Sequence, residues 1–307
     1  MHPMSIMTRR TFIGTAGIAA AVPAFSAVAG QQQNWKSPRG TVSVEKDVVF
    51  GKGGGMDLRC DIYRPPAGTE KRMATIHFHG GGFRGGNKES LSERVQPLAS
   101  RGYIAITAQY RLSGQAKWPS QIEDAKALIR WTRANAGRLG IQADRIAVVG
   151  YSAGGHLALF AAGTPDRPEF EGSGGNAGVS TKVAACVAYY PATAVRPRAD
   201  GTADALLPPG SNEAAHRAAS PTSYITSAFA PTVIFHGLED VTIPVESSQR
   251  LFQQLRDAKV PSELHTFDGV PHVFDSHPEF ADPCGAIADL FIDRRVLNPR
   301  KYPPFGG

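Results

Sequence analysis

Ser152 lies in the stretch Gly150-Tyr151-Ser152-Ala153-Gly154, which has the pattern G-x-S-x-G. Five residues of this kind are weak evidence alone, but here a β-branched run (145–149) precedes them and an Ala/Leu-rich helical run follows. A serine on a sharp turn from a strand into a helix presents its hydroxyl as a nucleophile, and the flanking glycines leave room for strand and helix to meet. The pattern predicts acyl transfer through Ser152.

A second stretch, His79-Gly80-Gly81-Gly82, follows another short apolar run. Acyl transfer needs N–H donors for the oxygen of the tetrahedral intermediate, and glycines leave those donors accessible. We predict that the amides of Gly81, Gly82 and Ala153 form this oxyanion hole. A phosphate-binding loop is disfavoured, because no G-K-[ST] follows the glycines.

A serine hydroxyl needs a base, and the base needs an orienting acid, in the chain order Ser, then Asp or Glu, then His. The run 231–235 reads as a buried strand that breaks into a loop carrying Glu239 and Asp240. Carboxylates just beyond the carboxyl end of a strand are where α/β sheets present functional groups. Both residues are candidates on position alone.

His272 is the predicted base, because it follows the last predicted strand on a short loop bounded by Gly and Pro. His156, one turn from Ser152, is expected to pack the start of the helix. Five other histidines are expected to have structural or solvated roles: His77, His216, His236, His265 and His277.

The elements that must position these residues alternate along the chain. Short apolar runs separated by helical patterns are typical of a mostly parallel sheet with helices on both faces. The predicted strands of this part are 74–78, 103–108, 145–149, 183–189, 231–235 and 262–267, with two earlier strands around 42–50 and 56–64. No internal repeat or second composition regime is present, so residues 30–307 are predicted to be one catalytic domain.

The clearest helix is predicted from Ser120 to Leu139. Ser120 is placed as its N-cap, and Gly140 is placed as the residue that ends it. Its apolar stripe should pack on the sheet and carry no chemistry.

The residues before this domain have the layout of an export signal. A basic pair, Arg9-Arg10, precedes an apolar Ala/Gly-rich stretch with a small-x-small site at 27–29. Residues 1–29 are therefore predicted to be a twin-arginine-like signal peptide, which implies a periplasmic or secreted bacterial protein.

Composition excludes several other classes. The formal net charge of +6 is spread along the chain and argues against a nucleic-acid surface. No apolar run is long enough to predict a membrane span. Cys60, Cys186 and Cys284 are too few and too scattered for a disulfide scaffold or zinc site, and we expect them to be small buried hydrophobes. No metal constellation or dinucleotide fingerprint is present, so we expect no cofactor.

Four stretches resemble a known family at matching order and spacing. They are "HFHGGGFRGGNK", "AQYRLSGQAKWPSQIEDAKALIRWTRANAGRLGIQADRIAVVGYSAGGHLA", "ASPTSYITSAFAPTVIFHGLEDVTIPV" and "GVPHVF". The chain resembles α/β-hydrolase esterases related to the hormone-sensitive-lipase-like group, and most of all the bacterial feruloyl/acetyl-xylan esterase-like family. The resemblance implies an α/β-hydrolase fold and selects Asp240 over Glu239 as the orienting acid. Two positions depart from the pattern: Gln109 stands where Asp or Asn is usual, and Ile243 where Val is common.

These inferences predict a serine carboxylic ester hydrolase with the triad Ser152, Asp240 and His272. Its expected substrates are short-acyl or aromatic-acid esters, including acetyl or feruloyl groups of plant polysaccharides. The loops 164–181 and 193–220 are expected to govern substrate choice. The alternatives are a general short-chain carboxylesterase, an amidase or formamidase with the same triad, and a non-catalytic binding protein on the same fold.

Overall fold

The computed structural model describes residues 40–196 and 206–302. The chain divides into Met1–Lys36 and Ser37–Gly307, and every described residue belongs to the second unit. The predicted signal at 1–29 lies outside the described residues.

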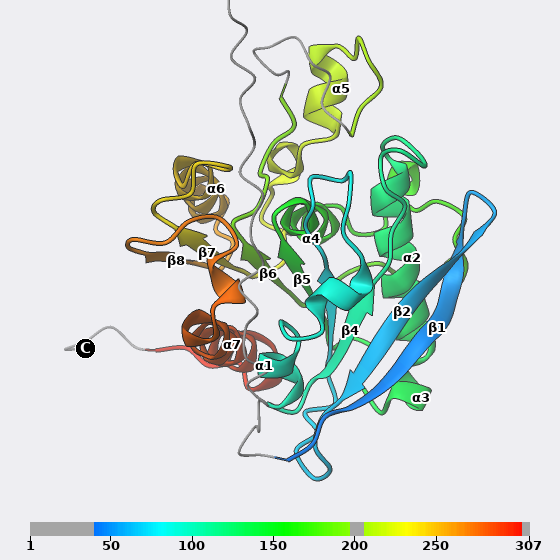
Figure 1. The fold of residues 1–307 in the computed structure, drawn as a ribbon, viewed down its shortest axis with the longest axis vertical. Coiled ribbons are helices and arrows are strands. Elements are labelled where there is room, and N and C mark those ends of the chain that lie inside the picture. Colours follow the sequence, from blue (N-terminus) through cyan, green and yellow to red (C-terminus); the bar gives the residue numbers. More distant parts are fainter. Residues whose placement is uncertain (1–39, 197–205, 303–307) are drawn as a thin grey trace, which may run out of the picture. The chain divides into compact units, whose positions relative to one another are not determined.

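The described residues form one eight-stranded sheet with the order β1-β2-β4-β3-β5-β6-β7-β8 (Figure 1). The strands β1 and β2, and β2 and β4, pair antiparallel, and all other neighbours pair parallel. The predicted mostly parallel sheet is therefore confirmed. The strands are β1 Ser43–Gly53, β2 Met56–Arg64, β3 Ala74–Phe78, β4 Ile104–Ala108, β5 Ile146–Tyr151, β6 Ala185–Tyr189, β7 Thr232–Gly237 and β8 Ser262–Phe267.

Helices cover both faces of this sheet, as predicted. The α-helices are α1 Gln96–Ala99, α2 Ser120–Ala134, α3 Ala136–Leu139, α4 Ala153–Gly163, α5 Glu213–Ala218, α6 Glu246–Asp257 and α7 Pro278–Ile292. Short 3-10 helices lie at Lys88–Leu91, Pro168–Phe170, Pro221–Tyr224 and Phe274–Ser276, and a short π-helix, Asp293–Leu297, follows α7.

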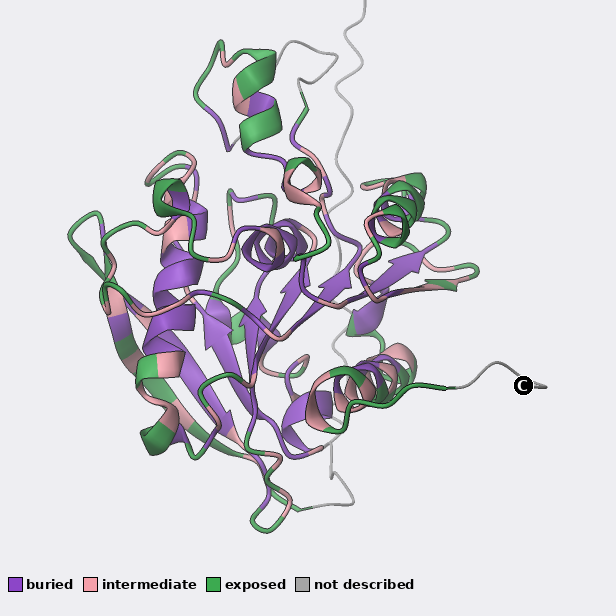
Figure 2. Cartoon of the chain, turned by 180° about the vertical axis from the view of Figure 1, so that it is seen from behind, coloured by how far each residue is buried: buried purple, intermediate pink, exposed green. Residues whose placement is uncertain are grey.

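The central strands are buried on both sides because helices pack on both faces of the sheet. Successive residues of a strand point to opposite faces and so contribute to different cores. In β5, Val148 belongs to the core shared with α2, α4 and α6, whereas Val149 belongs to the core shared with α1 and α7. Figure 2 shows these strands almost wholly buried between the two helical layers. Such a sheet can hold functional groups rigidly at the carboxyl ends of its strands.

The prediction of a single helix from Ser120 to Leu139, with Ser120 as its N-cap, is wrong in two respects. It is divided at Asn135, which has φ −99° and ψ 18° and belongs to neither α2 nor α3. Ser120 is the first residue of α2 and not its N-cap, because the Pro119 carbonyl accepts the first bonds, from the Ile122 and Glu123 amides. Gly140 ends α3 in the left-handed region with φ +71°, as predicted.

The three cysteines are free and buried, as expected. Cys60 and Cys186 lie in β2 and β6, and Cys284 lies in α7.

The loop from Thr164 to Thr181 is one of the two that the sequence analysis expected to govern substrate choice, and its two ends lie at the amino edge of the sheet. It leaves α4 at the end opposite Ser152 and leads into β6, where the Ala184 amide donates to Ile146 at the start of β5. The middle of the loop turns back toward the carboxyl side, where the Gly174 carbonyl accepts from the Lys52 amide of β1 and Gly172 lies against Glu123 in the first turn of α2. The substrate role expected of this loop therefore stays a prediction. The described residues of the other expected loop, 193–196 and 206–220, come after the carboxyl end of β6 in the chain.

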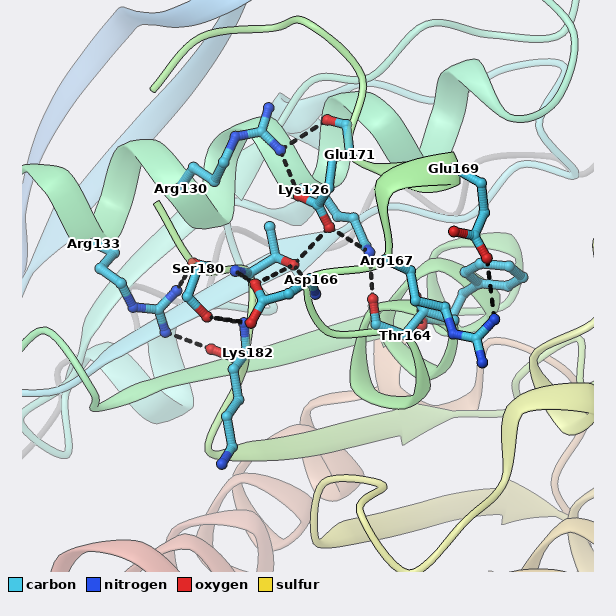
Figure 3. Close-up of polar contacts among 12 residues, drawn as sticks. Lys126, Arg130, Arg133, Thr164, Asp166, Arg167, Glu169, Glu171, Ser180 and Lys182 are labelled. Atoms are coloured by element: carbon cyan, nitrogen blue, oxygen red, sulfur yellow. Dashed lines mark hydrogen bonds and ion pairs between the residues drawn. The ribbon is translucent and has the colours of Figure 1, made fainter. Parts of the chain in front are cut away.

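Polar contacts fasten the 164–181 loop to α2 (Figure 3). Glu171 accepts from Lys126 Nζ at 2.8 Å and from Arg130 Nη1 at 2.8 Å. Lys126 has no exposed side-chain surface, and burial lowers its pKa while the Glu171 carboxylate opposes that shift. The contacts give the loop a structural role in anchoring the end of α4 to α2.

Candidate active site

Ser152 occupies the sharp turn between β5 and α4. Its backbone has φ +55° and ψ −115°, a conformation that non-glycine residues rarely adopt. The Ser152 amide donates to the Tyr189 carbonyl at 3.0 Å, which ties the turn to β6. The first turn of α4 passes so close to β3 that a Cβ on Gly154 would lie 2.0 Å from the Phe78 carbonyl oxygen. The predicted elbow is therefore present, with the Ser152 side chain partly exposed.

The structure brings Ser152, His272 and Asp240 together in one hydrogen-bonded chain. His272 Nε2 lies 2.9 Å from Ser152 Oγ, and His272 Nδ1 lies 2.6 Å from Asp240 Oδ2. Because an ionised carboxylate can only accept, Nδ1 carries the hydrogen and Nε2 is left to accept from the serine hydroxyl. This arrangement allows His272 to remove the proton of Ser152 during an attack.

Asp240 is held by four donors. Its Oδ1 accepts from the amides of Thr242 and Ile243, each at 2.9 Å, and its Oδ2 accepts from two imidazoles. Burial acts to raise the pKa of Asp240, but the hydrogen bonds from His236, His272 and Ile243 outweigh it and lower that pKa well below its usual range. The carboxylate is therefore ionised and oriented. Glu239, the rival candidate, is exposed, and its side chain makes no hydrogen bond or ion pair with the residues that the structure describes.

The second of those imidazoles belongs to His236, which lies in β7 and is fully buried. Its Nε2 lies 3.1 Å from Asp240 Oδ2 and 2.8 Å from the Ile243 carbonyl, so it carries a hydrogen. Its Nδ1 lies 2.7 Å from Ser248 Oγ in α6, whose hydroxyl donates to it. The sequence analysis gave His236 only a structural or solvated role and missed this contact, although its spacing of four residues before Asp240 was a signal.

The other histidines behave as expected. His156 lies in the first turn of α4, fully buried, with Nδ1 2.9 Å from the Ala192 carbonyl and its ring against Phe83 and Trp118. His265 contacts Glu263, and His277 is exposed.

The glycine loop after β3 lies directly beside the serine. A Cβ on Gly80 would be 3.2 Å from Ser152 Cβ. Gly81 and Gly82 have φ +109° and +60°, a backbone conformation that residues with a Cβ rarely adopt. Their two amides have no acceptor among residues 40–196 and 206–302. Ala153 is the first residue of α4, so its amide has no partner within the helix. All three predicted donors thus have no acceptor in the part of the chain that the structure describes.

This loop is braced from behind by His79 and Tyr110. His79 Nδ1 lies 2.7 Å from the Gly80 carbonyl, and the Tyr110 hydroxyl donates to the His79 carbonyl at 2.8 Å. Gln109, the departure from the family pattern, bonds elsewhere: its Oε1 accepts from the Arg59 amide of β2 at 3.1 Å. The substitution therefore acts on the pairing of β2 and β4 and not on the oxyanion loop.

Within residues 40–196 and 206–302, no group of three or more His, Cys, Asp or Glu side chains is arranged to hold a metal ion. No described helix is long and apolar enough to cross a membrane.

Residues 60–255 match the family model described as BD-FAE. The chain belongs to the BD-FAE family. Among curated proteins, it is 30% identical over 243 residues to the "Probable carboxylic ester hydrolase LipM" of Mycobacterium tuberculosis, covering 72% of this chain and 56% of that protein. It is also 30% identical over 246 residues to the esterase LipQ of the same organism, covering 72% of this chain and 57% of LipQ. The chain thus spans little more than half the length of these relatives.

Solved esterase structures share the fold of this BD-FAE member over most of its length. The propionate-bound esterase Est2 of Thermogutta terrifontis aligns with a TM-score of 0.70 and 28% identity, covering 87% of this chain and 98% of that one. A truncated carbohydrate esterase from gut microbiota aligns with a TM-score of 0.72 at 22% identity, covering 83% and 96%. The predicted α/β-hydrolase fold is confirmed.

Proposed function

We propose that this protein is a serine carboxylic ester hydrolase that works through an acyl-enzyme. The observation that carries the proposal is the hydrogen-bonded chain from Ser152 through His272 to Asp240, next to a glycine loop with uncommitted amides. Nucleophile, base and orienting acid in this relation are what acyl transfer by serine needs. The esterase names of LipM, LipQ and Est2 support the same reaction class.

In the first half-reaction, Ser152 Oγ attacks the ester carbonyl while His272 Nε2 takes its proton. Asp240 keeps His272 in the required tautomer and stabilises the imidazolium that forms. The tetrahedral intermediate then collapses: the bond from carbon to the alcohol oxygen breaks, and His272 returns the proton to the leaving alcohol. Ser152 is left acylated.

In the second half-reaction, His272 removes a proton from water, which attacks the acyl-enzyme and releases the acid. In both halves the amides of Gly81, Gly82 and Ala153 donate to the developing oxyanion. One donor of this kind typically contributes about 3 kcal/mol to transition-state stabilisation. Because glycine lets two of the donors face the carbonyl without an intervening Cβ, the loop is preorganised for this charge.

For the substrate, we propose esters of short acyl groups or aromatic acids, with acetyl or feruloyl groups on plant polysaccharides as the natural class. The propionate bound to the Est2 structure supports a short acyl group. We also propose that the protein is exported, since residues 1–29 carry the Arg9-Arg10 pair and an apolar stretch of a twin-arginine-like signal. Export would bring the enzyme to polymeric substrates outside the cytoplasm.

The test is turnover on acetylated xylan, methyl ferulate and a p-nitrophenyl ester series of increasing acyl length, with Ser152→Ala as the control. A higher kcat/KM on acetylated xylan or ferulate than on the nitrophenyl esters supports the polysaccharide substrate. Activity confined to short nitrophenyl esters rejects that substrate and leaves a general carboxylesterase. Matched amides in the same assay should be poor substrates, and an amide kcat/KM equal to that of the ester would contradict ester specificity.

A further inference from the structure

A buried polar cluster lies behind His272 and has no part in the mechanism above. Asp275, in the loop that carries His272, is 4% exposed. Its Oδ1 accepts a hydrogen bond from the Tyr190 hydroxyl, and its Oδ2 lies 3.1 Å from Arg94 Nε. Three side chains from three separate segments therefore meet next to the proposed base.

Tyr190 connects this cluster to the imidazole. Its ring and the His272 ring are 4.5 Å apart between centroids, at an interplanar angle of 61°. Tyr190 is fully buried and directly follows β6, where its amide donates to the Phe235 carbonyl at 2.7 Å. The ring is thus fixed at its backbone end by the sheet and at its hydroxyl end by Asp275.

The contact restrains a motion that the two hydrogen bonds of His272 do not. Bonds at Nδ1 and Nε2 fix the imidazole along the line from Asp240 to Ser152, but they leave the ring free to tilt about that line. An aromatic ring against its side opposes this tilt. A displacement of about 1 Å can cost about a hundredfold in rate, so such a restraint has catalytic consequences.

The ion pair with Arg94 holds the Asp275 carboxylate in place. Burial raises the pKa of Asp275, while the Arg94 guanidinium and the Tyr190 hydroxyl act in the opposite direction. Arg94 also lies over the Tyr151 ring, 5.2 Å from its centroid, and Tyr151 directly precedes Ser152. The cluster therefore bridges the segments that carry the proposed nucleophile and the proposed base.

We propose that Tyr190, anchored by Asp275 and Arg94, is a positioning residue for His272. The inference rests on the proposed function, because it assumes that His272 acts as the base. Tyr190 acts through its ring, and Asp275 and Arg94 act by holding that ring against the imidazole.

The chain offers a matched control for the test. Tyr103 is also a fully buried tyrosine whose hydroxyl donates to a carboxylate, Asp289 Oδ1, at 2.7 Å. It packs in the same α1 and α7 core but lies in the segment before β4, with no contact to His272. Tyr190→Phe and Tyr103→Phe thus remove the same kind of hydrogen bond at two places.

The experiment measures kcat, KM and the melting temperature of both variants on p-nitrophenyl acetate. We expect Tyr190→Phe to lower kcat about tenfold with KM changed less than about twofold, and Tyr103→Phe to lose comparable stability with kcat intact. Tyr190→Leu, which removes the ring, should lower kcat further, and Asp275→Asn should resemble Tyr190→Phe. These variants should also react more slowly than wild type with diethyl p-nitrophenyl phosphate, because Ser152 needs the base when it attacks the phosphorus and displaces p-nitrophenolate.

A wild-type kcat in both Tyr190→Phe and Tyr190→Leu would overturn the inference, as would equal kcat losses in Tyr190→Phe and Tyr103→Phe. The Ser152→Ala variant distinguishes failure of the positioning role from failure of the proposed function. If Ser152→Ala is inactive while the Tyr190 variants are normal, only the positioning role fails. If Ser152→Ala keeps full turnover, the proposed function fails first.

Discussion

His236 Nε2 lies 3.1 Å from Asp240 Oδ2, the oxygen that also accepts from His272. The contact is fully buried and comes from the strand that precedes the acid, so Asp240 is fixed by β7 as well as by its own loop. A carboxylate held at both oxygens cannot rotate away from His272. The orientation of the proposed base therefore depends on a histidine that does not touch the substrate.

Replacing His236 should test this dependence. His236→Leu removes a hydrogen bond to a charged group, an interaction that contributes about 1.5–3 kcal/mol, so we expect kcat to fall about tenfold or more with little change in KM. His236→Gln, which keeps an N–H donor, should lose less. The measurement is steady-state kinetics beside His265→Gln, a partly exposed histidine of β8, and equal kcat values for all three variants would contradict the interpretation.

Asp240 and Glu239 are adjacent in the chain but have different environments: Asp240 is buried and bonded to His272, whereas Glu239 is exposed. Asp240→Asn should lower kcat by about 10⁴-fold because an amide favours the wrong tautomer of His272. Glu239→Gln alters an exposed side chain and should leave kcat within about twofold of wild type. Comparing the two isosteric variants on p-nitrophenyl acetate checks this, and a larger loss for Glu239→Gln would reverse the assignment.

Glu171 should matter for stability and not for turnover. Its replacement by Ala leaves the buried Lys126 ammonium without its carboxylate, and breaking such a pair costs about 3–5 kcal/mol. Because the hydrogen bonds of Glu171 join the loop to α2 and to Thr181 and do not reach the proposed triad, kcat and the order of substrate preference should stay unchanged at temperatures where the variant is folded. Urea unfolding and the ester series together test this, and a changed substrate preference would contradict the purely structural role of Glu171 and support the substrate role expected of the 164–181 loop.

Acid should destabilise the fold partly through His77. Burial lowers the pKa of this histidine from 6.5 to about 3, so the unfolded chain binds a proton across that interval and the folded protein does not. The free energy of unfolding should therefore fall as the pH decreases from about 6.5 toward 3. His77→Gln should flatten this slope whatever its overall stability, whereas the exposed His277→Gln should leave it unchanged. An unaltered slope in His77→Gln would exclude His77 as the cause.

The sequence predicted most of the site because each proposed residue stands at the carboxyl end of a strand. Ser152 follows β5 in a glycine-flanked turn, Asp240 follows β7, and His272 follows β8, so the alternation of strands and helices placed all three on one edge. The fold followed from the same alternation. The strands at 74–78 and 262–267 have the predicted bounds.

What the sequence analysis missed depends on side-chain packing. Tyr190 and Asp275 are 85 residues apart, and nothing in their local patterns shows that the hydroxyl of one reaches the carboxylate of the other. His236 was given only a structural or solvated role, because its partner is identified only once Asp240 is placed.

The central claim is that Ser152 forms a covalent intermediate, and labelling tests it most directly. Wild-type protein and Ser152→Ala are treated with diethyl p-nitrophenyl phosphate and compared by intact mass and peptide mapping. The account predicts one diethylphosphoryl group on Ser152 of the wild type, in step with loss of esterase activity, and no adduct or turnover in Ser152→Ala. Inactivation with the adduct on another residue, or full turnover by Ser152→Ala, would contradict it.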